Sequence, residues 1–150
     1  MYLVSSCLAG VNCRYDGSNS ENKCIAKLVK EGKAIAVCPE QLAGLSTPRP
    51  CCEIIIDENS NKRVVSKDGK DLTKSFIEGA EKTLGIIKAA DINKAILQSR
   101  SPSCGCGLIY DGTFSGKLIE GDGLVAELLM KNGIEVYTEN DLDKASSKNK

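Results

Sequence analysis

The chain has 150 residues, among them eight cysteines, no histidine and no tryptophan, and its twenty basic residues balance twenty acidic ones. Without histidine, the sequence excludes Ser-His-Asp triads, Cys-His nucleophile pairs and every zinc site that needs an imidazole ligand. The zero formal charge disfavours nucleic acid as a partner, and no apolar run reaches the length of a membrane span. The first residues lack the features of a secretory signal, so we expect a cytoplasmic protein whose cysteines bind metal or catalyse rather than form disulfides.

The first predicted elements are a short buried strand at residues 2–5 and a glycine-bearing loop at residues 10–17. Ser18 and Glu21 have the spacing of a capping box, which marks the start of a helix. The apolar residues that follow recur at helical spacing, so the helix is expected to continue to near Gly32.

The next segment is predicted to contain a buried strand at residues 34–38, which Pro39 ends. A loop rich in proline and glycine then continues to residue 52. Polar residues separate two further strand-like segments, 53–57 and 62–66, and this pattern predicts a β-hairpin.

The longest helix is expected after Asp71, because apolar residues recur there about every 3.6 positions. Its apolar face comprises Leu72, Phe76, Ile77, Ala80, Leu84 and Ile87. A third buried strand is predicted at residues 95–99, and it leads into a tight loop at residues 100–107.

The C-terminal part is expected to form an apolar segment, a turn, a helix and a last strand, at residues 108–110, 111–116, 124–129 and 134–138. Asn132-Gly133 supplies a stop signal for that helix. The polar tail from Glu139 is expected to form a short helix that frays after Ala145.

Strands that alternate with helices predict an α/β fold: a single Rossmann-like domain with a mainly parallel sheet flanked by helices. We assign this domain to residues 1–145 and leave residues 146–150 as a polar tail. In such sheets, ligands bind beyond the carboxyl ends of the strands. The loops that follow three of the predicted strands begin at Cys7, Cys38 and Arg100, and each of these loops carries a cysteine.

Cys7, Cys38 and Cys104 are therefore candidates for one metal site. Three thiolates could bind three irons of a 4Fe–4S cluster or three positions of a tetrahedral metal, and simple packing of small buried side chains is the alternative. Among the other cysteines, Cys24 falls on the apolar face of a predicted helix, where packing is expected. The cysteines left without a role are Cys13, Cys24, Cys51, Cys52 and Cys106.

Polar residues beside these cysteines are candidates for acid–base and binding roles. With no histidine in the chain, Glu40 could act as a general acid or base, although capping of a turn is the commoner role for such a residue. Ser101 and Ser103 offer hydroxyl donors just before Cys104. Three arginines could bind a planar or anionic substrate or simply be surface charges: Arg14, Arg49 and Arg100.

The loops, taken as a set, resemble the bacterial thiouracil desulfidase family. The resemblance is carried, in this order, by SCLAGVNCRYDG at residues 6–17, VCPEQLAGLSTPRP at 37–50, SPSCG at 101–105 and IYDGTFSG at 109–116. It extends from Leu3 to about Thr138, which is nearly the whole chain.

The resemblance implies a 4Fe–4S cluster held by Cys7, Cys38 and Cys104, with the fourth iron free of protein ligands. It also implies that Glu40 and Ser101 are the catalytic residues. Further candidates for substrate binding are Arg14, Arg49 and Ser103.

The reaction that the resemblance implies is the non-redox removal of sulfur from a small thiolated compound such as 2-thiouracil. The open iron would bind the thione sulfur, and water activated by Glu40 would attack the carbon, so that sulfur leaves as sulfide. One alternative is a sulfur or iron–sulfur carrier module without catalysis, and another is a structural zinc domain. The sequence leaves the oligomeric state open.

Overall fold

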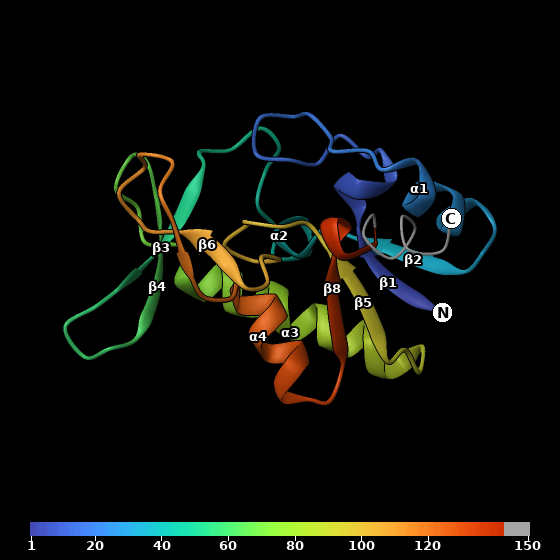
Figure 1. Cartoon of the computed structure of the whole chain (residues 1–150). Coiled ribbons are helices and arrows are strands. Elements are labelled where there is room, and N and C mark those ends of the chain that lie inside the picture. Colours follow the sequence, from blue (N-terminus) through green and yellow to red (C-terminus); the bar gives the residue numbers. More distant parts are fainter. Residues whose placement is uncertain (143–150) are drawn as a thin grey trace.

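The computed structural model describes residues 1–142 and contains a four-stranded sheet at its centre (Figure 1). Its strands are β1 (Tyr2–Ser5), β2 (Ala34–Val37), β5 (Lys94–Leu97) and β8 (Glu135–Thr138). They lie in the order β2-β1-β5-β8, and every neighbouring pair is parallel. The predicted α/β fold with a parallel sheet is therefore confirmed.

Helices cover both faces of this sheet. Successive side chains of a strand point to opposite faces, so each strand can contribute to a core on either side. The helical elements are the short η1 (Ser6–Ala9), α1 (Lys23–Lys30), α2 (Pro39–Leu42), α3 (Thr73–Ala89) and α4 (Leu124–Lys131). On one face, Leu3 packs in a core with residues of α3 and α4. On the other face, Val4 packs in a core with Ile25 of α1.

The prediction that a capping box at Ser18 starts the helix is wrong, because α1 begins later, at Lys23. Its N-cap is Asn22, whose Oδ1 accepts hydrogen bonds from the backbone N–H groups of Cys24 at 3.0 Å and Ile25 at 3.3 Å. Ser18 instead donates its backbone N–H to Oδ1 of Asp16 at 3.0 Å, which closes a local turn. The predicted end of the helix near Gly32 agrees with the structure.

The apolar face of α3 differs from the predicted face at Ile77, whose side chain is 45% exposed. The buried side of the helix comprises Thr73, Phe76, Gly79, Ala80, Thr83 and Ile87. These residues recur at three- and four-residue intervals, and Ile77 falls outside their stripe. The sequence pattern therefore placed the helix correctly and one of its residues on the wrong side.

The short helix α2 is absent from the predicted elements, which treated Pro39 only as the end of a strand. Proline is favourable at the first position of a helix, because its missing N–H would have had no partner there. Gly79 of α3 packs directly on this turn: a Cβ at Gly79 would lie 2.3 Å from the carbonyl oxygen of Pro39. The longest helix thus supports the turn that carries Glu40.

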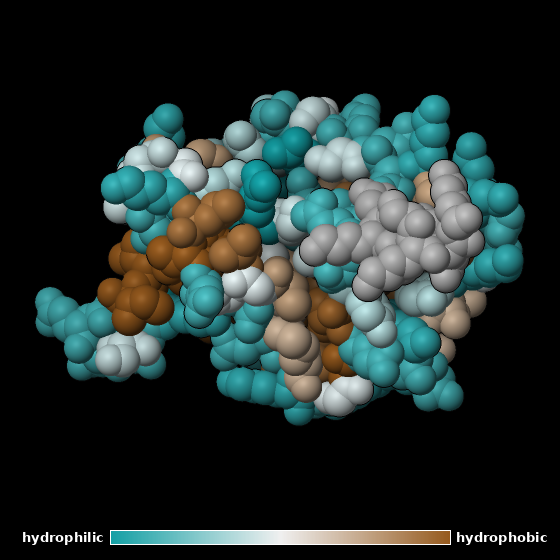
Figure 2. All heavy atoms as spheres, in the orientation of Figure 1, coloured by the Kyte–Doolittle hydropathy of each residue, from teal (hydrophilic) through white to brown (hydrophobic). Residues whose placement is uncertain are grey.

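Two antiparallel hairpins lie beside the N-terminal ends of α3 and α4 (Figure 1). The first, β3 (Cys52–Ile56) with β4 (Lys62–Ser66), was predicted, whereas in the second, β6 (Leu108–Tyr110) with β7 (Leu118–Glu120), the strand β7 was not. Figure 2 shows apolar side chains gathered over these hairpins, where the exposed large residues include Ile56, Leu108 and Ile119.

The C-terminal expectations reach beyond the part of the chain that the structure describes. Residues 139–142 are helical, as predicted for the start of the tail. The expected end of that helix near Ala145 and the polar tail at 146–150 lie outside the described residues. None of the helices within residues 1–142 is long and apolar enough to cross a membrane.

Candidate active site

The carboxyl ends of β1, β2 and β5 lead into the three segments that carry the predicted cysteine ligands. Cys7 lies in η1, Cys38 immediately precedes α2, and Cys104 lies in the loop after β5. In chain order, β2 is added on one side of β1 and β5 is added on the other side of β1. The direction in which strands are added therefore changes between β1 and β5. Ligands of parallel α/β sheets bind at such a change of direction.

The three predicted ligands line one small pocket together with Cys13, and we call this space the thiol pocket. Its volume is about 20 Å³, and all four cysteines are buried. The Cys7 thiol donates to Oε1 of Gln98 at 3.0 Å, and the Cys38 thiol donates to the carbonyl oxygen of Cys13 at 3.8 Å. Cys13 also packs in one buried cluster with Cys7 and Cys38. Four thiols, rather than three, therefore meet at this edge of the sheet.

Three thiols of this pocket, those of Cys13, Cys38 and Cys104, have raised pKa values. Burial raises the pKa of Cys104 to about 12, and the nearby charge of Glu40 acts in the same direction. The pKa of Cys38 is also raised, first by its hydrogen bond with Cys13 and then by burial. For Cys13, the hydrogen bond with Cys38 lowers the pKa, but the hydrogen bond with Cys7 and burial outweigh it and raise the pKa to about 11. A metal centre would therefore have to displace these protons.

No three cysteine or acidic side chains within residues 1–142 are arranged to hold a single metal ion. A cluster makes a different demand, because each thiolate binds a different iron and the ligands need not converge on one point.

Glu40 lies in the first turn of α2 and forms a buried ion pair with Arg49. Oε2 of Glu40 is 2.7 Å from Nη2 of Arg49, and the two side chains are 17% and 7% exposed. The same Nη2 donates to the carbonyl oxygen of Cys13 at 2.9 Å, and Nη1 donates to Oγ1 of Thr47 at 2.9 Å. One guanidinium thus ties α2 to the loop that contains Cys13.

Ser101 and Ser103 lie in a tight turn between β5 and Cys104. Oγ of Ser101 accepts hydrogen bonds from the backbone N–H groups of Ser103 and Cys104, both at 3.1 Å. Oγ of Ser103 is 3.0 Å from Oγ of Ser101 and donates to Oε1 of Glu40 at 3.3 Å. The two hydroxyls therefore form a continuous chain from Ser101 to the carboxylate.

The N-terminus of α4 fixes this turn in place. The backbone N–H groups of Leu124 and Val125 donate to the carbonyl oxygens of Pro102 at 3.0 Å and Ser103 at 2.8 Å. Gly123 approaches so closely that a Cβ there would lie 2.4 Å from the carbonyl oxygen of Ser103. The first turn of a helix has backbone donors without partners inside the helix, and here the loop carbonyls satisfy two of them.

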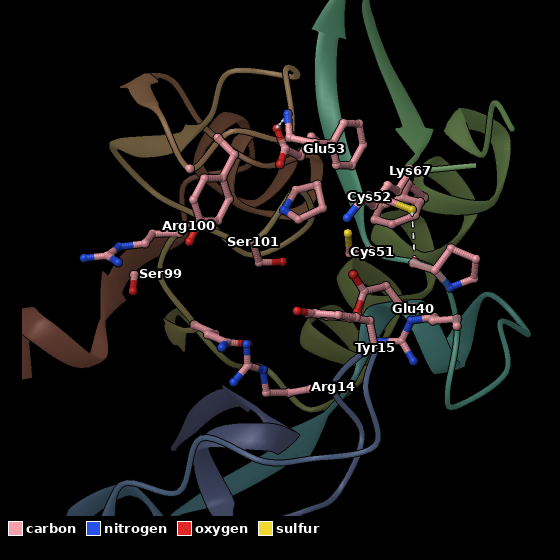
Figure 3. Close-up of a pocket in the computed structure, with 18 of the residues that line it drawn as sticks. Arg14, Tyr15, Glu40, Cys51, Cys52, Glu53, Lys67, Ser99, Arg100 and Ser101 are labelled. Carbon is pink, nitrogen blue, oxygen red and sulfur yellow. Dashed lines mark hydrogen bonds and ion pairs between the residues drawn. The ribbon is translucent and has the colours of Figure 1, made fainter. Parts of the chain in front are cut away.

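A larger cavity of about 600 Å³ opens beside the thiol pocket, and we call it the outer cavity (Figure 3). Both spaces are lined by Arg14, Glu40, Gln98 and Ser101. Figure 3 shows Glu40, Ser101 and Cys51 pointing toward the same space. The aromatic and cationic residues of the walls are Tyr15, Phe76, Tyr110, Phe114, Arg14, Arg49, Lys67 and Arg100. Such walls suit a flat, polar heterocycle, because rings can stack on it and cations can meet its oxygens.

One wall of the outer cavity depends on Glu53, a residue of β3 to which the sequence reasoning gave no role. Its Oε1 accepts hydrogen bonds from the backbone N–H groups of Gly112 at 2.9 Å and Phe114 at 3.1 Å. Phe114 has a positive φ of 57°, a conformation that a bulky residue adopts only when its surroundings impose it. Glu53 therefore holds the turn that places Phe114 at the cavity.

Comparison with known proteins agrees with the geometry of this site. A sequence model of the 2-thiouracil desulfurase family matches residues 2–141. The chain belongs to this family. Among its relatives, the YbbK protein of Bacillus subtilis (strain 168) is 48% identical over 148 residues, which cover 95% of this chain and 98% of YbbK. The predicted desulfidase family and the prediction of an enzyme are confirmed.

A solved structure of the [4Fe-4S]-dependent thiouracil desulfidase TudS matches the fold over almost its whole length. The TM-score is 0.86 with 40% sequence identity, and the match covers 98% of this chain and 95% of TudS. The arrangement of strands and loops around the thiol pocket thus belongs to a fold that is shared within the desulfurase family.

In this desulfurase-family chain, the predicted site residues lie together around two adjoining spaces. Cys7, Cys38, Cys104 and Ser103 line the thiol pocket, whereas Glu40, Ser101 and Arg14 line both spaces and Arg49 lines the outer cavity. Arg100, Cys51 and Cys52 also line the outer cavity, and burial raises the pKa of Cys52 to about 12.

The prediction that Cys24 faces the core is wrong, because this side chain is exposed and the buried residues of α1 are Ile25 and Ala26. Cys13 and Gln98 were not predicted as site residues. Cys13 stands in one of the quoted motifs, so its position was a usable signal, but only the folded loop brings its thiol beside Cys7 and Cys38.

Proposed function

We propose that this chain is an iron–sulfur-dependent, non-redox desulfidase that converts a small thiolated compound such as 2-thiouracil to its oxo product and sulfide. The observation that carries the proposal is the junction of a buried thiol pocket with a cavity that contains a fixed carboxylate. Membership in the 2-thiouracil desulfurase family and the likeness to TudS support it.

Cys7, Cys38 and Cys104 would hold the cluster as a 4Fe–4S centre and leave one iron without a protein ligand. The donor set fits this group, since buried free thiols from three loops face one space. Because about 20 Å³ is less than the volume of such a cluster, binding has to widen the thiol pocket toward the outer cavity. When bound, the cluster supplies an iron that takes up the substrate sulfur and draws electron density from the carbon–sulfur bond.

Glu40 acts as the general base. Its Oε2 is held by Arg49 and its Oε1 by Ser103, so the carboxylate keeps one orientation while it lines the cavity. We assign it one proton of the attacking water, which it passes to the departing sulfur, and then the second proton, which it takes from the new hydroxyl and passes to the same sulfur as the carbon–sulfur bond breaks. The thione and water thus give the oxo product and hydrogen sulfide, with no electron gained or lost.

Ser101 orients the substrate. Its oxygen already accepts two backbone hydrogen bonds, so its hydroxyl hydrogen is the group left to donate, either to Ser103 or to an atom of the substrate ring. Arg14 lies where both spaces meet and can bind a developing negative charge on the ring. The aromatic walls then enclose the flat ring of the substrate.

The site also supports the expected cytoplasmic location and a small molecule as the substrate. All eight cysteines are free thiols, and a function that depends on them requires a reducing compartment, so we place the reaction in the cytoplasm. A cavity of about 600 Å³ suits a small molecule as the substrate.

The test is anaerobic reconstitution with iron and sulfide, followed by a sulfide-release assay with 2-thiouracil. We expect about four irons per chain and turnover of the thiolated base. Cys7→Ser, Cys38→Ser and Cys104→Ser should each lose the cluster, whereas the matched control Cys24→Ser, which changes an exposed thiol on α1, should keep it.

Two results would contradict the proposal. If all three variants retained four irons, the ligand assignment would be wrong. A wild-type chain that binds the cluster but releases no sulfide from any thiolated pyrimidine would be the carrier module that was considered as the alternative.

A further inference from the structure

Cys13 is a buried thiol to which the proposed mechanism gives no role. It is only 1% exposed and lines the thiol pocket with the three proposed ligands. It packs in one buried cluster with Cys7 and Cys38, and its carbonyl oxygen accepts a hydrogen bond from the Cys38 thiol at 3.8 Å. A free thiol in direct contact with two proposed ligands is placed to affect what those ligands bind.

Hydrogen bonds hold both the backbone N–H and the carbonyl group of Cys13. Its N–H donates to the carbonyl oxygen of Val11 at 2.8 Å, and its own carbonyl oxygen accepts from Nη2 of Arg49 at 2.9 Å. The backbone N–H of Arg49 in turn donates to the carbonyl oxygen of Tyr15 at 2.7 Å. These contacts keep the Cys13 thiol next to Cys38 and Cys7 when the pocket takes up a ligand.

Cluster binding removes the protons of the ligating thiols. A cysteine that binds iron does so as a thiolate and has no proton to donate. Among the four thiols that line the pocket, Cys13 is then the one that still carries a proton to donate to these sulfurs. Hydrogen bonds to ligating sulfurs withdraw electron density from a cluster and are one of the factors that set its reduction potential.

We propose that Cys13 is a positioning residue rather than a ligand, and that its thiol donates hydrogen bonds to the iron-bound sulfurs of Cys38 and Cys7. This donation makes the cluster less electron-rich, raises its reduction potential and strengthens the open iron as an acceptor for the substrate sulfur. The inference rests on the cluster-binding part of the proposed function and is independent of the desulfidase reaction.

The test compares the wild-type chain with Cys13→Ala, Cys13→Ser and the exposed control Cys24→Ala, all reconstituted anaerobically and without substrate. Iron and labile sulfide are measured first, and the midpoint potential is then determined by a redox titration followed by electron paramagnetic resonance. We expect the full cluster in all four proteins and a more negative potential in Cys13→Ala. Cys13→Ser should show a smaller shift of the potential than Cys13→Ala, because a hydroxyl also donates a hydrogen bond. Cys24→Ala should have the potential of the wild type.

Several outcomes would overturn the inference. Loss of iron from both Cys13 variants would make Cys13 a ligand, and potentials equal to the wild type would remove its role as a donor. Equal shifts in Cys13→Ala and Cys13→Ser would mean that only the size of the side chain matters. A wild-type chain that takes up no iron would overturn the cluster and this inference together, whereas a loaded chain without turnover would overturn the reaction alone.

Discussion

The carboxylate of Glu40 has a partner on each oxygen, Arg49 on Oε2 and Ser103 on Oε1. In Glu40→Gln the amide can no longer take a proton, so we expect the cluster content to be unchanged and the turnover of 2-thiouracil to fall by roughly 100-fold or more. Iron analysis and the sulfide-release assay on the same sample measure both quantities. Glu31→Gln, on the surface beyond α1, is the control, and normal turnover in Glu40→Gln would exclude Glu40 as the base.

Arg49 is the partner that makes the buried charge of Glu40 tolerable. In Arg49→Met the carboxylate loses its cation, and we expect the metal-free chain to lose about 3 kcal/mol of unfolding free energy. Urea unfolding measures this loss. The double variant Glu40→Gln/Arg49→Met has no unpaired charge, so it should be more stable than Arg49→Met alone. A double variant that is less stable would contradict this account.

Sequence reasoning grouped the candidate residues that lie at the ends of strands, and it missed the contacts that depend on loop conformation. Cys7, Cys38 and Cys104 could be grouped because parallel strands bring their carboxyl ends to one edge. The pairing of Arg49 with Glu40 could not be predicted, because it arises from the path of the loop between α2 and β3. Glu53 was missed for the same reason, since its partners lie in a turn far along the chain.

At the scale of elements, α3 approaches α2 closely at Gly79, which lies against Pro39. An exposed helical glycine is usually improved by alanine, but at Gly79 the new Cβ would collide with a backbone oxygen. We expect Gly79→Ala to lower the unfolding free energy by about 1–3 kcal/mol and to disturb the turn that carries Glu40.

Gly85 provides the matched control on the same helix, because a Cβ there would meet no atom within 4 Å. We expect Gly85→Ala to raise the unfolding free energy by about 0.5–1 kcal/mol. Denaturant titrations of both variants decide the matter. Equal effects of the two substitutions would show that helix propensity, and not contact with α2, controls Gly79.

The elements that the sequence predicted well have either a periodic apolar pattern or an apolar run between turn residues. The four sheet strands, the first hairpin, α3 and α4 follow directly from such patterns. The elements that were missed, α2 and β7, are four and three residues long. Their sequences, PEQL and LIE, show neither pattern, so tertiary contacts decide their conformation.

At the scale of the whole molecule, the thiol pocket joins segments from distant parts of the chain, so a bound cluster links them. A ligand that binds only the folded chain stabilises it, and we expect the reconstituted protein to resist unfolding by roughly 3 kcal/mol more than the metal-free protein. Anaerobic thermal unfolding before and after chelation of iron measures the difference. Cys104→Ser should show no such difference, and the same gain in this variant would contradict the proposed ligands.

The attachment of the Ser101–Cys104 turn to α4 has a consequence for the order of events during synthesis. Cys7, Cys13 and Cys38 leave the ribosome early, but Cys104 follows much later, and its turn gains its backbone partners only when Leu124 and Val125 have been made. A growing chain therefore carries an incomplete set of thiols until Cys104 has been made. We expect a growing chain that stops before Leu124 to take up no complete cluster.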